Sequence, residues 1–153
     1  MPAAIKTKTS APPEIDAELP SRLRFALMRL ARRLRQQHDS DTTQSQLSAL
    51  SSVAVHGPIT LGELAAYERV APPTMTRIVS HLEERTLVHR EVDPSDRRVA
   101  RLTVTADGER LLGEARQAKT AYLAARIDHL SDEEKAQLQA ALPILEKLLG
   151  DPE

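Results

Sequence analysis

The chain has 153 residues and a formal net charge of −1, a length that suits one domain with a sizeable hydrophobic core. Aromatic residues make up only 2% of the chain, so Leu, Ala, Val and Ile must build the core, which favours closely packed helices over a β-sandwich. The absence of cysteine excludes disulfides, Cys-ligated zinc and thiol redox sensing. We find neither an apolar run of about 18 residues nor a signal-peptide core, and we therefore expect a soluble, cytoplasmic protein.

The N-terminal segment, residues 1–17, is rich in Pro, Lys and Thr, and we expect it to form a flexible tail. Pro20 suits the start of a helix, along which leucines recur at helical spacing: Leu23, Leu27, Leu30 and Leu34. Arginines decorate the same helix at six positions: Arg22, Arg24, Arg29, Arg32, Arg33 and Arg35. The pattern indicates a subunit-contacting helix whose arginines meet acidic groups of a partner or line a ligand cavity, or else a solvated amphipathic face.

The next helix is predicted to open at Thr43, because Thr43 and Gln46 have the spacing of a T-x-x-Q cap. It carries apolar residues as far as the Gly57-Pro58 pair, which is a strong helix breaker. Ile59, directly after this breaker, can form a short strand against a later hairpin. This segment is therefore predicted to form one capped helix followed by a short strand.

A helix-turn-helix is predicted from Thr60 onward. Thr60 and Glu63 have the spacing of a capping box, which places a helix start at Leu61. Pro72 cannot continue that helix, but the proline pair suits the first turn of a second one, from about Pro73 to Arg85. One face of the second helix carries Met75, Ile78, Val79 and Leu82, and the residues that point largely elsewhere are Thr74, Thr76, Arg77 and His81. Two helices joined by a few residues, the second polar on its open face, are typical of this motif.

A β-hairpin is predicted to follow. The segments Leu87–Val92 and Val99–Val104 are rich in β-branched residues and flank the sequence D-P-S-D-R-R, which supplies turn-forming side chains. Arg97 and Arg98 place two guanidinium groups beside this turn. A helix-turn-helix followed by such a hairpin is a winged helix.

Two further helices are predicted after the hairpin. Residues from Thr105 resemble a helix N-terminus, and the helix should run to about His129. Ser131 and Glu134 form an S-x-x-E capping box that opens a final helix, which Pro143 should kink or divide. Leu-rich stripes at both ends of the chain leave much apolar surface for a second subunit to cover, so we expect a homodimer. The alternative is that these stripes pack within one monomer.

Several motifs in the chain resemble those of MarR-family transcriptional regulators. The most specific is D-P-S-D-R-R-V-A-R-L-T-V-T-A-D-G, from Asp93 to Gly108, supported by T-Q-S-Q-L from Thr43 and T-R-I-V from Thr76. The resemblance spans about residues 20–149 and implies a mainly α fold with a small β-hairpin wing. The implied organisation is a single domain at 18–153, with a winged helix-turn-helix DNA-binding part at 43–104 and dimerisation helices at 18–38 and 105–149.

The resemblance also implies the function and its residues. A homodimer would read a palindromic operator, with the second helix of the motif in the major groove, the wing in the minor groove, and threonine or serine hydroxyls at helix starts on phosphates. Asp96 would orient an arginine. The expected DNA-binding residues are Thr43, Ser45, Thr60, Pro73, Thr74, Thr76, Arg77, Asp96, Arg97 and Arg98. Alternatively, the wing arginines only brace the hairpin with Asp93 and Asp96.

The charge of this region is nearly balanced along the sequence. Residues 74–101 carry six arginines but also five acids, Glu83, Glu84, Glu91, Asp93 and Asp96. A basic face would therefore have to come from geometry, with the acids turned inward or bracing arginines.

Other function classes fit the sequence less well. No nucleophile, acid–base pair or phosphate-binding glycine loop suggests an enzyme, and His38 and His56 lack the neighbouring ligands of a metal site. A winged-helix protein–protein adaptor without specific DNA binding stays open as an alternative. The resemblance implies no required cofactor, a small anionic or phenolic effector, and repression as the commoner outcome.

Overall fold

The computed structural model describes residues 17–37, 41–94 and 96–150, so the predicted N-terminal tail lies almost wholly outside the described residues. The chain divides into two compact units, one ending at Arg33 and one beginning at Leu34, and each is described by itself. Helix α1, Leu19–Arg35, supplies most of the described part of the first unit. The helix predicted from Pro20 is therefore confirmed, and it begins one residue earlier.

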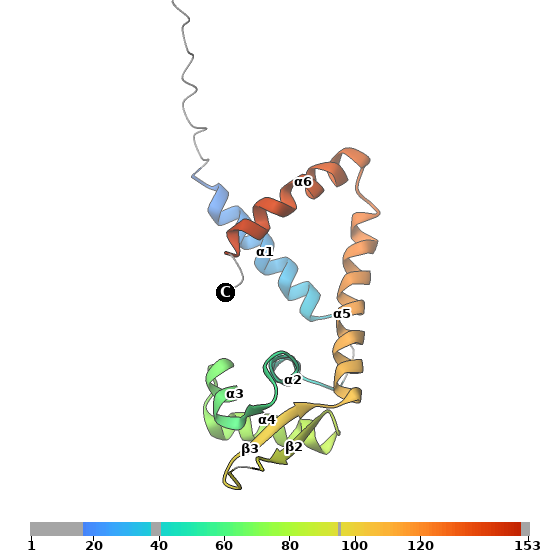
Figure 1. The fold of residues 1–153 in the computed structure, drawn as a ribbon. Coiled ribbons are helices and arrows are strands. Elements are labelled where there is room, and N and C mark those ends of the chain that lie inside the picture. The colour runs from blue at the N-terminus through green and yellow to red at the C-terminus, as the bar shows by residue number, and fades with distance from the viewer. Residues whose placement is uncertain (1–16, 38–40, 95, 151–153) are drawn as a thin grey trace, which may run out of the picture. The chain divides into compact units, whose positions relative to one another are not determined.

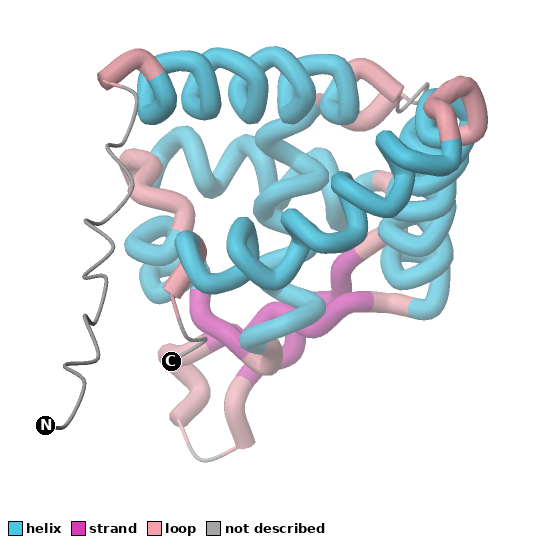
Figure 2. The backbone as a smooth tube through the Cα atoms, turned by 90° about the horizontal axis from the view of Figure 1, so that it is seen from above, coloured by secondary structure: helices cyan, strands magenta, loops and turns pink. Residues whose placement is uncertain are grey.

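The second unit contains the winged helix and two further helices (Figure 1). Its elements, in order, are α2 (Gln44–His56), β1 (Ile59–Thr60), α3 (Leu61–Tyr67), α4 (Pro72–Glu84), β2 (Val88–Val92), β3 (Ala100–Val104), α5 (Ala106–Ile127) and α6 (Asp132–Leu148). The three strands form an antiparallel sheet in the order β1-β3-β2, and helices make up most of the remaining backbone (Figure 2). Ile59 lies opposite Leu102 of β3, so the short strand expected at Ile59 is confirmed. The mainly α fold with a small hairpin wing is also confirmed.

Local capping interactions begin the helices where the sequence predicts them. The reciprocal hydrogen bonds of a capping box are present at Thr43, Thr60 and Ser131, and the Thr105 side chain accepts from the Gly108 backbone N–H. The pKa of Glu63 is lowered, first because its carboxylate accepts from the Thr60 backbone N–H and next because it accepts from the Thr60 hydroxyl.

Two helix boundaries differ slightly from the prediction. α4 runs from Pro72 to Glu84, one residue earlier at each end than the predicted helix, since both prolines fit its first turn. α6 continues as one helix through Pro143, so the proline does not divide it.

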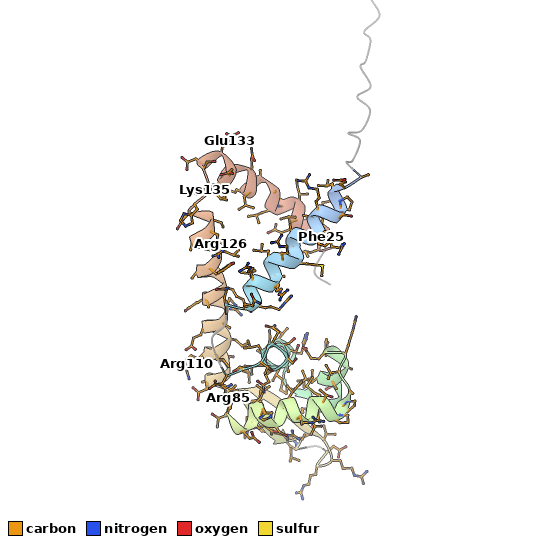
Figure 3. The ribbon with its side chains drawn as sticks, turned by 180° about the vertical axis from the view of Figure 1, so that it is seen from behind. Phe25, Arg85, Arg110, Arg126, Glu133 and Lys135 are labelled. Carbon is orange, nitrogen blue, oxygen red and sulfur yellow. The ribbon has the colours of Figure 1, made fainter. Side chains whose placement is uncertain are left out.

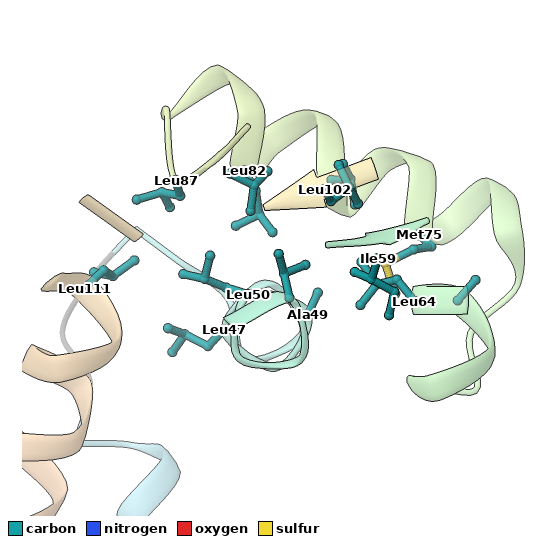
Figure 4. Packing of buried hydrophobic residues seen from close by; sticks show 14 of the residues in the cluster. Leu47, Ala49, Leu50, Ile59, Leu64, Met75, Leu82, Leu87, Leu102 and Leu111 are labelled. Carbon is teal, nitrogen blue, oxygen red and sulfur yellow. The ribbon is translucent and has the colours of Figure 1, made fainter. Parts of the chain in front are cut away.

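The core of the second unit joins helices from the motif to the wing. The largest fully buried side chains include Leu50 of α2, Leu64 of α3, Met75 and Leu82 of α4, and Leu102 of β3 (Figure 4). Burying each such side chain contributes about 1.5–3 kcal/mol to stability. Because Leu102 belongs to the hairpin, the same core that positions α4 also positions the wing.

The connection from α4 to β2 requires an uncommon backbone conformation. Thr86 has a φ of 56°, in the left-handed region where a β-branched residue is sterically strained. The turn is nonetheless well bonded, because the Leu87 backbone N–H donates to the Leu82 carbonyl at 2.9 Å and the Thr105 hydroxyl donates to the Thr86 carbonyl at 2.6 Å. These contacts hold Thr86 in the left-handed conformation, although threonine itself prefers a negative φ.

We predict that Thr86→Gly stabilises the protein. Glycine adopts the left-handed conformation without steric cost, which outweighs its larger entropy in the unfolded chain by about 0.5–1 kcal/mol. Chemical unfolding in urea measures the difference. Ala121→Gly, at an exposed position inside α5, is the matched control and should destabilise by about 1 kcal/mol. A loss of stability in Thr86→Gly comparable to that of the control would contradict the assigned strain.

Candidate nucleic-acid interface

The face of α4 that points away from the core is polar and open to solvent. Met75, Val79 and Leu82 are buried on its inner face. The predicted contact residues Pro73, Thr74, Thr76 and Arg77 are all exposed. No side chain caps the N-terminus of this helix, and the prolines in its first turn have no N–H to donate. The Thr74 backbone N–H donates to the Ala71 carbonyl at 2.9 Å, so the start of α4 offers side chains rather than free backbone N–H groups to a ligand.

Three arginines of the winged helix are held by partners. Arg90 of β2 forms a two-pronged ion pair with Glu83 of α4, with both N–O distances at 2.9 Å. Arg101 of β3 donates to Asp93 at 2.9 Å, beside the hairpin turn. Arg85, at the C-terminal end of α4 (Figure 3), donates to the hydroxyl of Thr42, which is buried. These arginines brace the wing and the end of α4.

The other three arginines of residues 74–101 keep their guanidinium groups unpaired among the residues that the structure describes: Arg77, Arg97 and Arg98. All three are exposed. The Arg98 backbone N–H donates to Asp96 at 2.9 Å, so Asp96 orders the hairpin turn through the main chain. Figure 3 shows long, nitrogen-ended side chains projecting from the hairpin that joins β2 and β3. These arginines were all predicted from the sequence as DNA contacts.

Four of the acids in this region lie beside a basic side chain. Glu83 and Asp93 pair with arginines as described above. Glu84 lies 3.2 Å from a His81 ring nitrogen, and Glu91 lies 3.4 Å from a His89 ring nitrogen. Pairing thus leaves Arg77 on α4 and Arg97 and Arg98 at the wing without a carboxylate partner among the described residues, although the sequence charge of this region is nearly balanced.

The predicted phosphate contacts at helix starts differ in what their hydroxyls can offer. The Thr60 hydroxyl donates to Glu63 at 2.7 Å, so its single proton is engaged in the capping box. The Thr43 hydroxyl oxygen accepts from the Gln46 backbone N–H at 3.3 Å, which leaves its proton available. Ser45 is exposed, with no hydrogen-bond partner for its side chain in the described part of the chain. Thr43 and Ser45 therefore suit phosphate donation better than Thr60 does.

A carboxylate between α2 and the turn of the helix-turn-helix was missed by the sequence reasoning. Glu68, directly after α3, accepts hydrogen bonds from the Ser48 hydroxyl at 2.7 Å and the Ser52 hydroxyl at 2.5 Å. The two serines lie one helical turn apart on α2, so the carboxylate ties both to the segment that leads into α4. Hydrogen bonds to a charged acceptor are stronger than neutral ones. Glu68 thereby helps to set where α4 begins.

Arg69, the next residue, was also missed. Its φ is 53°, and its exposed guanidinium has no partner among the described residues. It adds a further cation in the turn that precedes α4. Across the same described ranges, no three His, Asp or Glu side chains are grouped to hold a metal ion, and no helix is long and apolar enough to cross a membrane.

A groove of about 380 Å³ lies between the start of α3 and the wing. Its walls include Thr60, Leu61, Arg90 and Arg98. The groove thus brings a wing arginine beside the β1–α3 segment.

Comparisons with known proteins give consistent results. The family model described as "MarR family" matches residues 42–100. An HTH-type transcriptional regulator of Mycobacterium leprae is 39% identical over 137 residues, which cover 89% of this chain and 96% of the relative. The HTH-type transcriptional repressor MdtR of Bacillus subtilis is 33% identical over 99 residues, covering 65% of this chain and 63% of MdtR. A mutant of MepR from S. aureus, solved bound to an oligodeoxyribonucleotide, shares the fold with a TM-score of 0.70 at 22% identity, covering 88% of this chain and 99% of MepR.

The division between braced and unpaired arginines predicts different effects on stability. Arg101→Ala removes an ion-pair partner of Asp93, whose side chain is only 15% exposed, and should lower the free energy of unfolding by about 1–2 kcal/mol. Arg97→Ala and Arg98→Ala remove unpaired exposed groups and should change it by no more than about 0.5 kcal/mol each. Urea unfolding of the three variants measures this. Equal losses in all three would favour the alternative that the wing arginines brace the hairpin.

Proposed function

Because this chain belongs to the MarR family of transcriptional regulators, we propose that it is a repressor that binds a palindromic operator as a homodimer. The observation that carries the proposal is the set of unpaired arginines, Arg77 on α4 and Arg97 and Arg98 on the wing. An exposed guanidinium without a protein partner is free to form a two-pronged hydrogen bond with a phosphate or a guanine edge. The MepR mutant bound to an oligodeoxyribonucleotide supports DNA binding by this fold.

The two arginine positions suit two different grooves. In the proposed complex, α4 lies in the major groove with its N-terminal turns towards the bases, where Arg77 forks onto guanine or phosphate. The hairpin tip reaches the adjacent minor groove, and an A/T-rich segment would favour it because a narrow minor groove is more negative. Thr43 and Ser45 donate to phosphates at the start of α2.

A homodimer is supported by the helices at the two ends of the chain. Neither α1 nor α6 has a buried residue. In α6 the exposed side chains include Leu142, Ile144 and Leu148, which are 48%, 64% and 66% exposed. A second copy that covers such surfaces forms a closed twofold pair, and that symmetry matches a palindromic operator.

The direction of regulation and the effector belong to the same proposal. MdtR, a relative at 33% identity, is a transcriptional repressor, which supports repression. The arginines of α1 offer guanidinium groups to a small anionic or phenolic effector, and an effector that weakens DNA binding must bind the DNA-free state more tightly. No cofactor is needed for this activity, and the protein would act in the cytoplasm, where it meets chromosomal DNA.

The double variant Arg77→Ala/Arg98→Ala tests the proposal. Loss of one contact in each groove should weaken binding to a selected duplex at least about 30-fold, and should reduce the slope of log K against log salt by about two for each copy bound. Fluorescence anisotropy across a range of salt concentrations measures both quantities on duplexes that the wild-type protein selects from a random library.

The control is Arg116→Ala/Lys119→Ala on α5, which removes the same charge from residues outside the winged helix. It should keep the wild-type affinity to within a few-fold. Unchanged DNA affinity in the Arg77/Arg98 variant would contradict the site. Duplex binding that is equally weak for every sequence in the wild type would instead favour the adaptor function.

A further inference from the structure

The two threonines on the exposed start of α4 differ in how their hydroxyls are used. The Thr76 hydroxyl donates to the Pro72 carbonyl, one turn earlier in the same helix, at 2.9 Å. The Thr74 hydroxyl, by contrast, has no partner among the described residues. Both side chains are exposed. The same residue type therefore presents two different chemical surfaces within one turn of the helix.

The hydrogen bond to Pro72 decides what Thr76 can offer a ligand. A threonine hydroxyl has one proton, and here the helix backbone takes it. The bond also holds the oxygen against the preceding turn. The Cγ2 methyl, which occupies another staggered position on the same Cβ, is then the group left on the solvent side. Thr76 therefore has no proton left to donate, and it presents a methyl group beside an oxygen that can only accept.

The bases differ in what they offer to such a side chain. In the major groove guanine presents two acceptors, and a side chain without a free proton cannot hydrogen-bond to either. Thymine presents a C5-methyl group, which an apolar side chain contacts favourably. The position also fits, because Thr76 is exposed and lies next to Arg77, the leading candidate for a base contact.

We infer that Thr76 selects a thymine in each operator half-site by contact between its methyl and the thymine C5-methyl, whereas Thr74 uses its hydroxyl as a donor. This inference rests on the proposed function and adds a specificity-determining residue to it. Removing one methyl group from such a contact should weaken binding about fourfold, or roughly 15-fold when both half-sites of a palindrome are changed.

The experiment replaces thymines by deoxyuridine, which lacks only the C5-methyl group. The duplex is one that the full-length wild-type protein selects from a random library, with thymines changed symmetrically, one position at a time. For the wild type, we expect one position per half-site at which deoxyuridine weakens binding roughly 15-fold. Thermal unfolding of each variant checks that it is folded.

Three variants assign that position to a side chain. Thr76→Val keeps both methyl-sized branches, so it should retain both the affinity and the response to deoxyuridine. Thr76→Ser keeps the hydroxyl but lacks the methyl, so it should bind more weakly and should no longer respond at that position. Thr74→Val is the matched control, which should lose affinity through its missing donor while still responding to deoxyuridine.

The outcomes separate this inference from the function on which it rests. If Thr76→Val loses affinity as Thr76→Ser does, the hydroxyl is the group that is used and the inference is wrong. If the wild type binds its selected duplex but responds to no deoxyuridine substitution, the inference fails and the proposed function stands. If the wild type selects no duplex at all, both fail.

Discussion

α4 is held in one orientation by the burial of a single apolar face. Met75, Val79 and Leu82 are each 0–1% exposed and belong to the same core as Leu102 of the wing. Rotating the helix by half a turn would return all three side chains to water, at about 1.5–3 kcal/mol each. The penalty keeps the opposite face, with its threonines and Arg77, in solvent. Since Leu102 lies in β3, the same burial fixes where the hairpin leaves the core.

Ion pairing within the protein decides which arginines of the interface remain open to a ligand, and the amino-acid composition alone does not show this. The ion pair of Glu83 and Arg90 joins α4 to β2, and Arg101 pairs with Asp93 at the hairpin turn. Both pairs hold the wing in place. Arg77 and Arg98 are left without partners among the described residues, and they are the arginines that the proposed complex assigns to the major and the minor groove. Glu83 and Asp93 therefore help to hold the wing that carries Arg97 and Arg98, so a net charge of −1 is compatible with a DNA-binding role.

The sequence predicted the fold, and the exposure of the α4 contact residues, because the responsible signals are local. Capping pairs such as Thr60 and Glu63 are three residues apart, and the hydrophobic period of α4 appears within a few turns. The Ser48–Glu68 and Glu83–Arg90 contacts could not be predicted from the sequence, because packing between different elements brings those partners together. The Thr60 pattern supported both a helix cap and a phosphate contact, and only the direction of its hydroxyl bond distinguishes them. The predicted DNA contacts themselves stay predictions.

Hydroxyl-radical footprinting of the wild-type protein on a selected duplex tests the central claim most directly, because it reports both the groove contacts and the symmetry of the complex. A dimer that reads with α4 and the wing should protect two equivalent segments related by a twofold axis, with centres separated by about 10 base pairs or a multiple of this spacing. The protection should fade as salt rises and should be absent on a scrambled duplex. Protection of one segment, without a second segment related to it by the twofold axis, would contradict the dimer. Equal protection of the scrambled duplex would contradict sequence-specific reading.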